Sequence, residues 1–186
     1  NSKIFLYQNS MEVAAGNEAA APVLEKVDKM KWWAYARGGA GDLLLSPFGK
    51  AEAREQYMIN NTLFTPKDSS GYQFWEWHAR WVVQQFYKPN PSIDGFFEDN
   101  TFWRPRVDAD WNRDGVLDLK DSPQAGKWLR EGYRQRFALM HQLMPGKYLI
   151  GNIADWGDKN AVLTELVGTL DGGVMEGILG TTYSPE

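Results

Sequence analysis

Short apolar runs alternate along the chain with longer stretches in which apolar residues recur every three or four positions. The short runs predict strands over residues 3–8, 32–36, 93–98, 148–152 and 171–176. The longer stretches predict helices over residues 19–30, 72–87, 123–144 and 160–167. The segment 42–70 has the weakest pattern, and we expect a short helix near 51–58 and a long loop there.

Strands that alternate with helices of this length indicate a parallel sheet. No GxGxxG or GxxxxGK[ST] motif opens any of the helices, so a nucleotide-binding open sheet has no support. A complete TIM barrel has eight strands in about 250 residues, whereas this chain of 186 residues offers five candidate strands. The prediction is therefore an α/β fold of TIM-barrel type, with an incomplete portion of the barrel forming a single domain over residues 1–186.

Composition excludes several classes of function. The net charge is −4 and basic residues do not cluster, so nucleic acid is not an expected partner. No apolar run reaches the roughly 18 residues of a membrane helix, so membrane insertion is not expected either. The absence of cysteine excludes disulfides, thiolate metal sites and cysteine nucleophiles. The nine tryptophans belong either to the core or to a platform for sugar rings.

The segment DWNRDGVLDLKD, residues 110–121, has the spacing of a calcium-binding loop. A glycine, Gly115, stands at the sixth position, where the loop needs a sharp turn. Aspartate replaces the usual glutamate at the twelfth position, as in dockerin-type loops. The predicted Ca²⁺ ligands are Asp110, Asn112, Asp114, Val116 through its carbonyl, Asp118 and Asp121. We expect a structural ion that braces a loop carrying Trp103 and Trp111, and a calcium-rich location outside the cell or on its surface.

Acids and amides follow several predicted strands, which is where parallel α/β folds place reacting groups. Glu98 and Asp99 end the strand over 93–98, and Glu176 ends the strand over 171–176. Successive side chains of a strand point to opposite faces, so only one of Glu98 and Asp99 can face the barrel mouth. A pair of such carboxyls is the machinery of glycoside hydrolysis. The expected substrate contacts are Asn152, Asp155, Trp103 and Trp156.

The run SIDGFFEDNTFW resembles the "DG-hydrophobic-hydrophobic-x-D-N" strand of hypothetical glycosyl hydrolase families with TIM-barrel folds, which are distantly similar to endo-α-1,4-polygalactosaminidase-type enzymes. YLIGNIADW and DGGVMEGILG resemble the strands that follow in those families. The resemblance spans about residues 93–180 and implies a barrel and glycoside hydrolysis. It implies Asp99, rather than Glu98, and Glu176 as the catalytic carboxyls, with Asn152 lining the cleft.

Two kinds of function follow from these patterns. The first is a calcium-stabilised glycoside hydrolase that acts on a polysaccharide or oligosaccharide through Asp99 and Glu176. The alternative is a non-catalytic carbohydrate-binding or structural protein, because an incomplete barrel has exposed strand edges. In a surface assembly, a protein partner would cover the missing strands.

Overall fold

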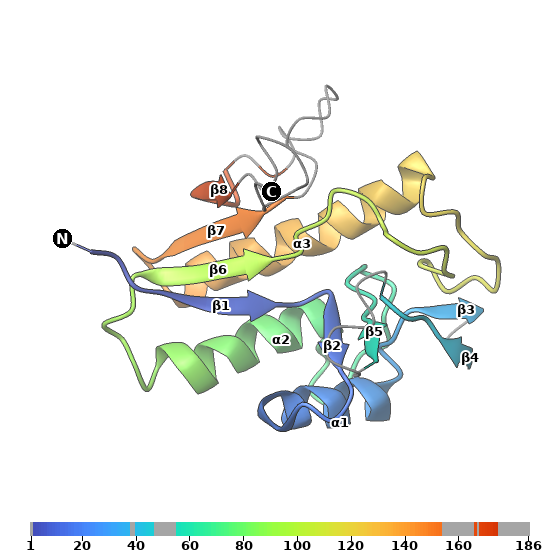
Figure 1. Cartoon of the computed structure of the whole chain (residues 1–186), viewed down its shortest axis with the longest axis horizontal. Helices are drawn as coiled ribbons and strands as arrows, with labels where there is room; N and C mark the ends of the chain where they lie inside the picture. Colours follow the sequence, from blue (N-terminus) through green and yellow to red (C-terminus); the bar gives the residue numbers. More distant parts are fainter. Residues whose placement is uncertain (1, 38–39, 47–54, 154–165, 167, 175–186) are drawn as a thin grey trace, which may run out of the picture.

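The computed structural model describes residues 2–37, 40–46, 55–153, 166 and 168–174. Its centre is a parallel four-stranded sheet in the order β1-β6-β7-β8 (Figure 1). The strands are β1 (Phe5–Asn9), β6 (Gly95–Asp99), β7 (Tyr148–Asn152) and β8 (Gly172–Val174). The predicted parallel α/β architecture is confirmed, with four of the five expected strands in the sheet.

Two helices cover one face of this sheet. They are α2 (Phe74–Val82), which continues as the π-helical turn η2 (Val83–Tyr87), and α3 (Pro123–Leu143). The side chain of Ser122 caps α3 by accepting a hydrogen bond from the Ala125 amide, and Pro123 follows at a position where no amide hydrogen is needed. Among the described residues, no helix has the length and apolar character to cross a membrane.

The two faces of the sheet differ because side chains alternate along each strand. Phe96 and Leu149 are fully buried in the main core, among apolar residues of α2 and α3. On the opposite face, Tyr7 and Tyr148 are 60% and 43% exposed, and Phe97 packs its ring against Tyr7 at 6.0 Å. This second face is the one that lines the interior of a closed barrel.

The segment between β1 and α2 forms a separate small layer with its own core (Figure 1). It consists of β2 (Glu12–Ala14), η1 (Glu18–Ala20), α1 (Ala21–Met30), β3 (Tyr35–Arg37), β4 (Ala40–Leu43) and β5 (Gln56–Met58). β2 pairs with β5 and β3 pairs with β4, both antiparallel. Buried Val27, Trp32 and Phe74 join this layer to α2.

Two predictions fail in this layer. The run 32–36 does not add a parallel strand to the sheet: Tyr35–Arg37 pairs antiparallel with β4, and Trp32 packs edge-on against Phe74 at 5.8 Å. The helix predicted near 51–58 is wrong over Gln56–Met58, which is a strand because its backbone pairs with β2. The helix predicted over 160–167 lies outside the described residues except for Leu166.

Candidate active site

The carboxyl ends of β1, β6 and β7 lie side by side and bring Asn9, Asp99 and Asn152 to one edge of the sheet. The Asp99 carboxylate accepts three hydrogen bonds there. They come from the Tyr7 hydroxyl at 2.7 Å, the Asn152 side-chain amide at 2.8 Å and the Asn100 backbone amide at 2.9 Å. Three donors around one carboxylate fix its orientation.

Tyr7 serves this carboxylate as a donor. Burial raises the pKa of the Tyr7 hydroxyl well above its usual value of 10, and the hydrogen bond to Asp99 raises it further. The hydroxyl therefore keeps its proton at physiological pH. Because Asp99 cannot donate when ionised, the bond runs from Tyr7 to Asp99.

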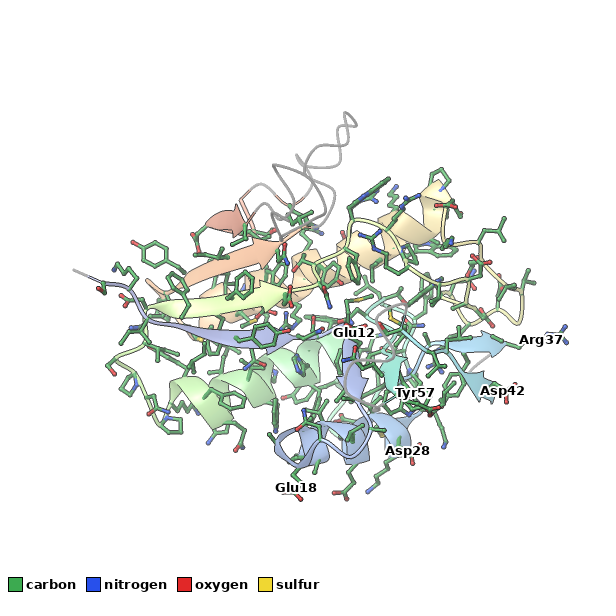
Figure 2. The ribbon with its side chains drawn as sticks, viewed as in Figure 1. Glu12, Glu18, Asp28, Arg37, Asp42 and Tyr57 are labelled. Carbon is green, nitrogen blue, oxygen red and sulfur yellow. The ribbon has the colours of Figure 1, made fainter. Side chains whose placement is uncertain are left out.

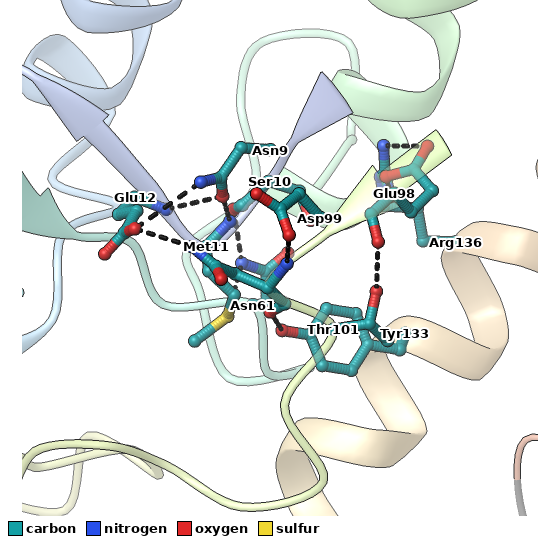
Figure 3. A network of polar contacts seen from close by, with 11 residues as sticks. Asn9, Ser10, Met11, Glu12, Asn61, Glu98, Asp99, Thr101, Tyr133 and Arg136 are labelled. Carbon is teal, nitrogen blue, oxygen red and sulfur yellow. Dashed lines mark hydrogen bonds and ion pairs between the residues drawn. The ribbon is translucent and has the colours of Figure 1, made fainter. Parts of the chain in front are cut away.

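Glu98, the neighbouring acid, points to the opposite face. Its carboxylate forms a bidentate ion pair with the Arg136 guanidinium of α3 at 2.6 and 3.1 Å, and both side chains are at most 1% exposed. Figure 3 shows this pair directed toward α3 and Asp99 directed away from it. Glu98 thus lies on the face that α3 covers, and Asp99 lies on the opposite face.

A further acid, Glu12, enters the site from β2 and was not among the predicted residues. The Asn9 side-chain oxygen accepts hydrogen bonds from the backbone amides of Met11 and Glu12 at 3.0 and 3.4 Å. This turn folds the chain back over the end of β1. The Glu12 carboxyl then accepts hydrogen bonds from the Asn100 side chain at 2.7 Å and the Asn9 side chain at 3.5 Å. Figure 3 shows Glu12 beside Asn9.

The environment of Glu12 disfavours its negative charge. The residue is 6% exposed, and burial raises the pKa of its carboxyl above the usual 4.5. Hydrogen bonds from Ser46, Asn9 and Asn100 oppose that rise, whereas the nearby charge of Asp99 adds to it. An acid three residues after the end of a strand, following an asparagine that can form such a turn, is the sequence signal that could have revealed it.

A cavity of about 340 Å³ opens beside this edge of the sheet. Its lining includes Tyr7, Asn9 and Glu12, which also belong to the network around Asp99. It also includes the aromatic side chains of Trp81 and Phe86. A few polar groups among apolar and aromatic ones are typical of a small-molecule site.

The predicted substrate contacts have different outcomes. Asn152 is 4% exposed and donates to Asp99, so the structure brings these two predicted residues together. The Trp103 ring lies against the Arg104 guanidinium at 5.2 Å, on the loop between β6 and α3. Asp155, Trp156 and Glu176 fall outside the described residues. Trp111, expected at the mouth of the cleft, is instead fully buried in the main core.

The predicted calcium loop has the backbone of a tight turn. The Asp110 carboxylate accepts from the Asp114 and Gly115 amides at 3.0 and 2.8 Å. The Asn112 side chain accepts from Asp114 at 3.0 Å. Gly115 has a φ of 91°, a conformation that favours glycine. These contacts tie the first half of the loop to its own amides.

The second half of the loop differs from a metal site. Asp121 forms an ion pair with Arg104, and Asp118 accepts from the Trp111 amide at 2.9 Å. Burial raises the pKa of Asp118, with further contributions from the charges of Asp114 and Asp110. Within the described residues, no three acidic or histidine side chains converge as metal ligands would. Calcium binding therefore stays a prediction.

Comparisons with solved structures identify the fold. A cycloisomaltooligosaccharide glucanotransferase from a Paenibacillus species, complexed with cycloisomaltoheptaose, is similar over 94% of this chain and 22% of its own, with a TM-score of 0.57 and 15% identity. The glycoside hydrolase domain of PelA from Pseudomonas aeruginosa is similar over 95% of this chain and 51% of its own, with a TM-score of 0.50 and 15% identity. The chain thus spans about a fifth and about half the length of these two proteins.

The sequence itself matches no protein-family model and no curated protein. At 15% identity the two structural likenesses concern the fold alone. The chain therefore has an α/β fold similar to that of these two structures, with a four-stranded parallel sheet among the described residues.

Proposed function

We propose that the chain is part of a glycoside hydrolase that acts on a polysaccharide, and that Asp99 is one of its two catalytic carboxyls. The observation that carries this proposal is the placement of Asp99. It ends a central strand of a parallel sheet, at the edge where such folds hold their reacting groups. One of the two structural neighbours is itself a glycoside hydrolase domain.

The contacts of Asp99 suit a carboxylate that attacks a sugar or activates a water molecule. Tyr7, Asn152 and the Asn100 amide hold it with three hydrogen bonds, so little reorganisation is needed when charge develops on the sugar. A glycosidase also needs a second carboxyl that protonates the leaving oxygen. Glu176 is our proposed second carboxyl, because it follows β8 along the chain and β8 runs parallel to β7.

The proposal is tested by incubating the protein with a panel of neutral and amino-sugar polysaccharides, and with cycloisomaltoheptaose, while new reducing ends are measured. We expect cleavage of at least one glycan. Asp99→Asn should abolish that cleavage, because the amide keeps the size of the side chain and loses its charge.

Asp94→Asn is the matched control, since Asp94 immediately precedes β6, at the end opposite Asp99, and pairs with Lys3 at 2.9 Å. This variant should cleave at the wild-type rate. Binding of a glycan with no cleavage by the wild type would instead support a non-catalytic carbohydrate-binding protein. Equal cleavage by wild type and Asp99→Asn would remove Asp99 from the reaction.

We also propose that residues 110–121 bind Ca²⁺ as a structural ion. The support is the ligand spacing, the positive φ of Gly115 and the mutual repulsion of the loop carboxylates, which a cation would relieve. Binding requires Asp121 to leave Arg104. An ion so held would suit the predicted location outside the cell or on its surface.

Calorimetric titration with CaCl₂ after chelation tests this part separately. We expect one bound ion per chain and a higher thermal midpoint with calcium than with chelator. Asp114→Asn should weaken the binding. Absence of heat and of any thermal shift would leave the loop as a turn held by its own hydrogen bonds.

A further inference from the structure

Two buried glutamates of this molecule are held in opposite ways. Glu98 has an arginine counter-charge in Arg136, at 2.6 Å, and is a structural carboxylate. Glu12 is also buried, at 6% exposure, yet none of the described residues places a cation within ion-pair distance of it. The negative charge of Asp99 adds to the rise in its pKa. Folding therefore places Glu12 where burial and electrostatics both work against its ionisation.

The hydrogen bonds of Glu12 leave room for one more. A carboxylate offers about four lone-pair positions. One oxygen accepts from the Asn100 and Asn9 side chains, and the other accepts from the Ser46 hydroxyl. The described contacts thus fill three positions, and the fourth belongs to the oxygen that Ser46 contacts.

Glu12 also lines the cavity described above, together with Tyr7 and Asn9. At about 340 Å³ the cavity is at the small end of the roughly 300–1,000 Å³ range of small-molecule sites. Tyr7, which lines the cavity, donates a hydrogen bond to Asp99, and Trp81 and Phe86 add aromatic surface to the lining. A sugar ring offers hydroxyl groups to such polar side chains and an apolar face to such aromatic ones.

We propose that this cavity takes one hexose ring of the glycan and that Glu12 binds a hydroxyl group of that ring. The inference rests on the proposed glycoside hydrolase function and adds a substrate-binding residue to it. In its protonated form the Glu12 carboxyl both donates and accepts a hydrogen bond, and in its charged form it accepts from the sugar. Asn100 joins the two acids, because its side chain donates to Glu12 and its backbone amide donates to Asp99.

The stability of the protein should show the cost of this arrangement. The pKa of Glu12 is higher in the folded state than in the unfolded chain, where it is near 4.5. The contribution of protonated Glu12 to the free energy of unfolding is therefore complete below pH 4.5, and it is lost as the pH rises through the pKa of the folded state. Glu12→Gln removes the ionisation, so it should raise the thermal midpoint at pH 7 and leave it unchanged at pH 4. A structural carboxylate would give the opposite result, with a lower midpoint at pH 7.

Binding is tested without turnover, by saturation-transfer NMR with methyl glycosides of glucose, galactose and mannose and of their 2-amino forms. Glu12→Gln is compared with Glu18→Gln, because Glu18 is an exposed acid six residues away, on the outside of the small layer (Figure 2). We expect at least one glycoside to bind the wild type and Glu18→Gln alike. Glu12→Gln should weaken its affinity about tenfold, as expected when the hydrogen bond between a sugar hydroxyl and the carboxyl is lost.

Three results would overturn the inference: no glycoside binds, Glu12→Gln binds as the wild type does, or Glu12→Gln lowers the midpoint at pH 7. Different results would refute the proposed function, because that function requires cleavage of a glycan and requires Asp99 for it. Cleavage that needs Asp99, with sugar binding indifferent to Glu12, would refute only the cavity site. Sugar binding that needs Glu12, with cleavage indifferent to Asp99, would refute only the assignment of Asp99.

Discussion

Replacing Arg136 by methionine tests whether Glu98 is the structural member of the adjacent acid pair. The guanidinium makes two hydrogen bonds to Glu98, at 2.6 and 3.1 Å, with side-chain exposures of 0% and 1%. Its removal leaves Glu98 buried without a counter-charge, which costs about 3–5 kcal/mol. A domain of this size loses about 2–4 °C of thermal midpoint per kcal/mol, so the expected loss is about 6–20 °C.

The test is to measure the thermal midpoints of three variants by differential scanning calorimetry. Arg134→Met is the matched control on the same helix, because Arg134 pairs with Glu131 on the surface and its loss should hardly move the midpoint. Glu98→Leu combined with Arg136→Met should recover much of the loss, since no lone charge remains. A midpoint for Arg136→Met as close to the wild type as that of Arg134→Met would refute the structural role of Glu98 and reopen it as a candidate for the site.

Two further predictions concern the site and the packing behind it. Tyr7→Phe removes a donor to Asp99 at 2.7 Å, so kcat on a cleaved glycan should fall about tenfold; an unchanged kcat would mean that this bond does not assist the reaction. Gly132→Ala would place a methyl group 1.8 Å from the Asn61 carbonyl oxygen, so the thermal midpoint should drop. Gly126→Ala would place its methyl group 2.8 Å from the end of the Arg130 side chain and no nearer than 3.4 Å to backbone, so it should be tolerated better. Equal midpoints would contradict the close packing of α3.

The sequence pattern was sufficient where local periodicity decides the structure. The apolar runs at Phe5–Asn9, Gly95–Asp99 and Tyr148–Asn152 became parallel strands, and the three-and-four spacing of Phe74–Val82 became a helix. The pattern did not predict which strands pair with each other. The run at 32–36 has the composition of a buried strand, but only tertiary packing of Trp32 on α2 decides that the segment stays out of the main sheet.

For the candidate site too, the sequence predicted what local pattern determines and not what depends on contacts between distant residues. Asp99 and Asn152 were predicted because they end strands, and strand ends meet at one edge, where the structure places both. Alternation separated Glu98 from Asp99 but could not say which face the helices cover, and the contact with Arg136, 38 residues away, decides that. Glu12 was missed because it does not end a strand and meets Asn100 across 88 residues.

The most direct test of the proposed function is the ratio of kcat between Asp99→Asn and the wild type on the glycan that the wild type cleaves fastest. Both proteins, and the Asp94→Asn control, must first show the same thermal midpoint. We predict a loss of about a thousandfold or more for Asp99→Asn and none for the control, because Asp99 lies at the edge of the sheet where we place the reaction and Asp94 precedes the opposite end of that strand. A ratio near one for Asp99→Asn would contradict the account.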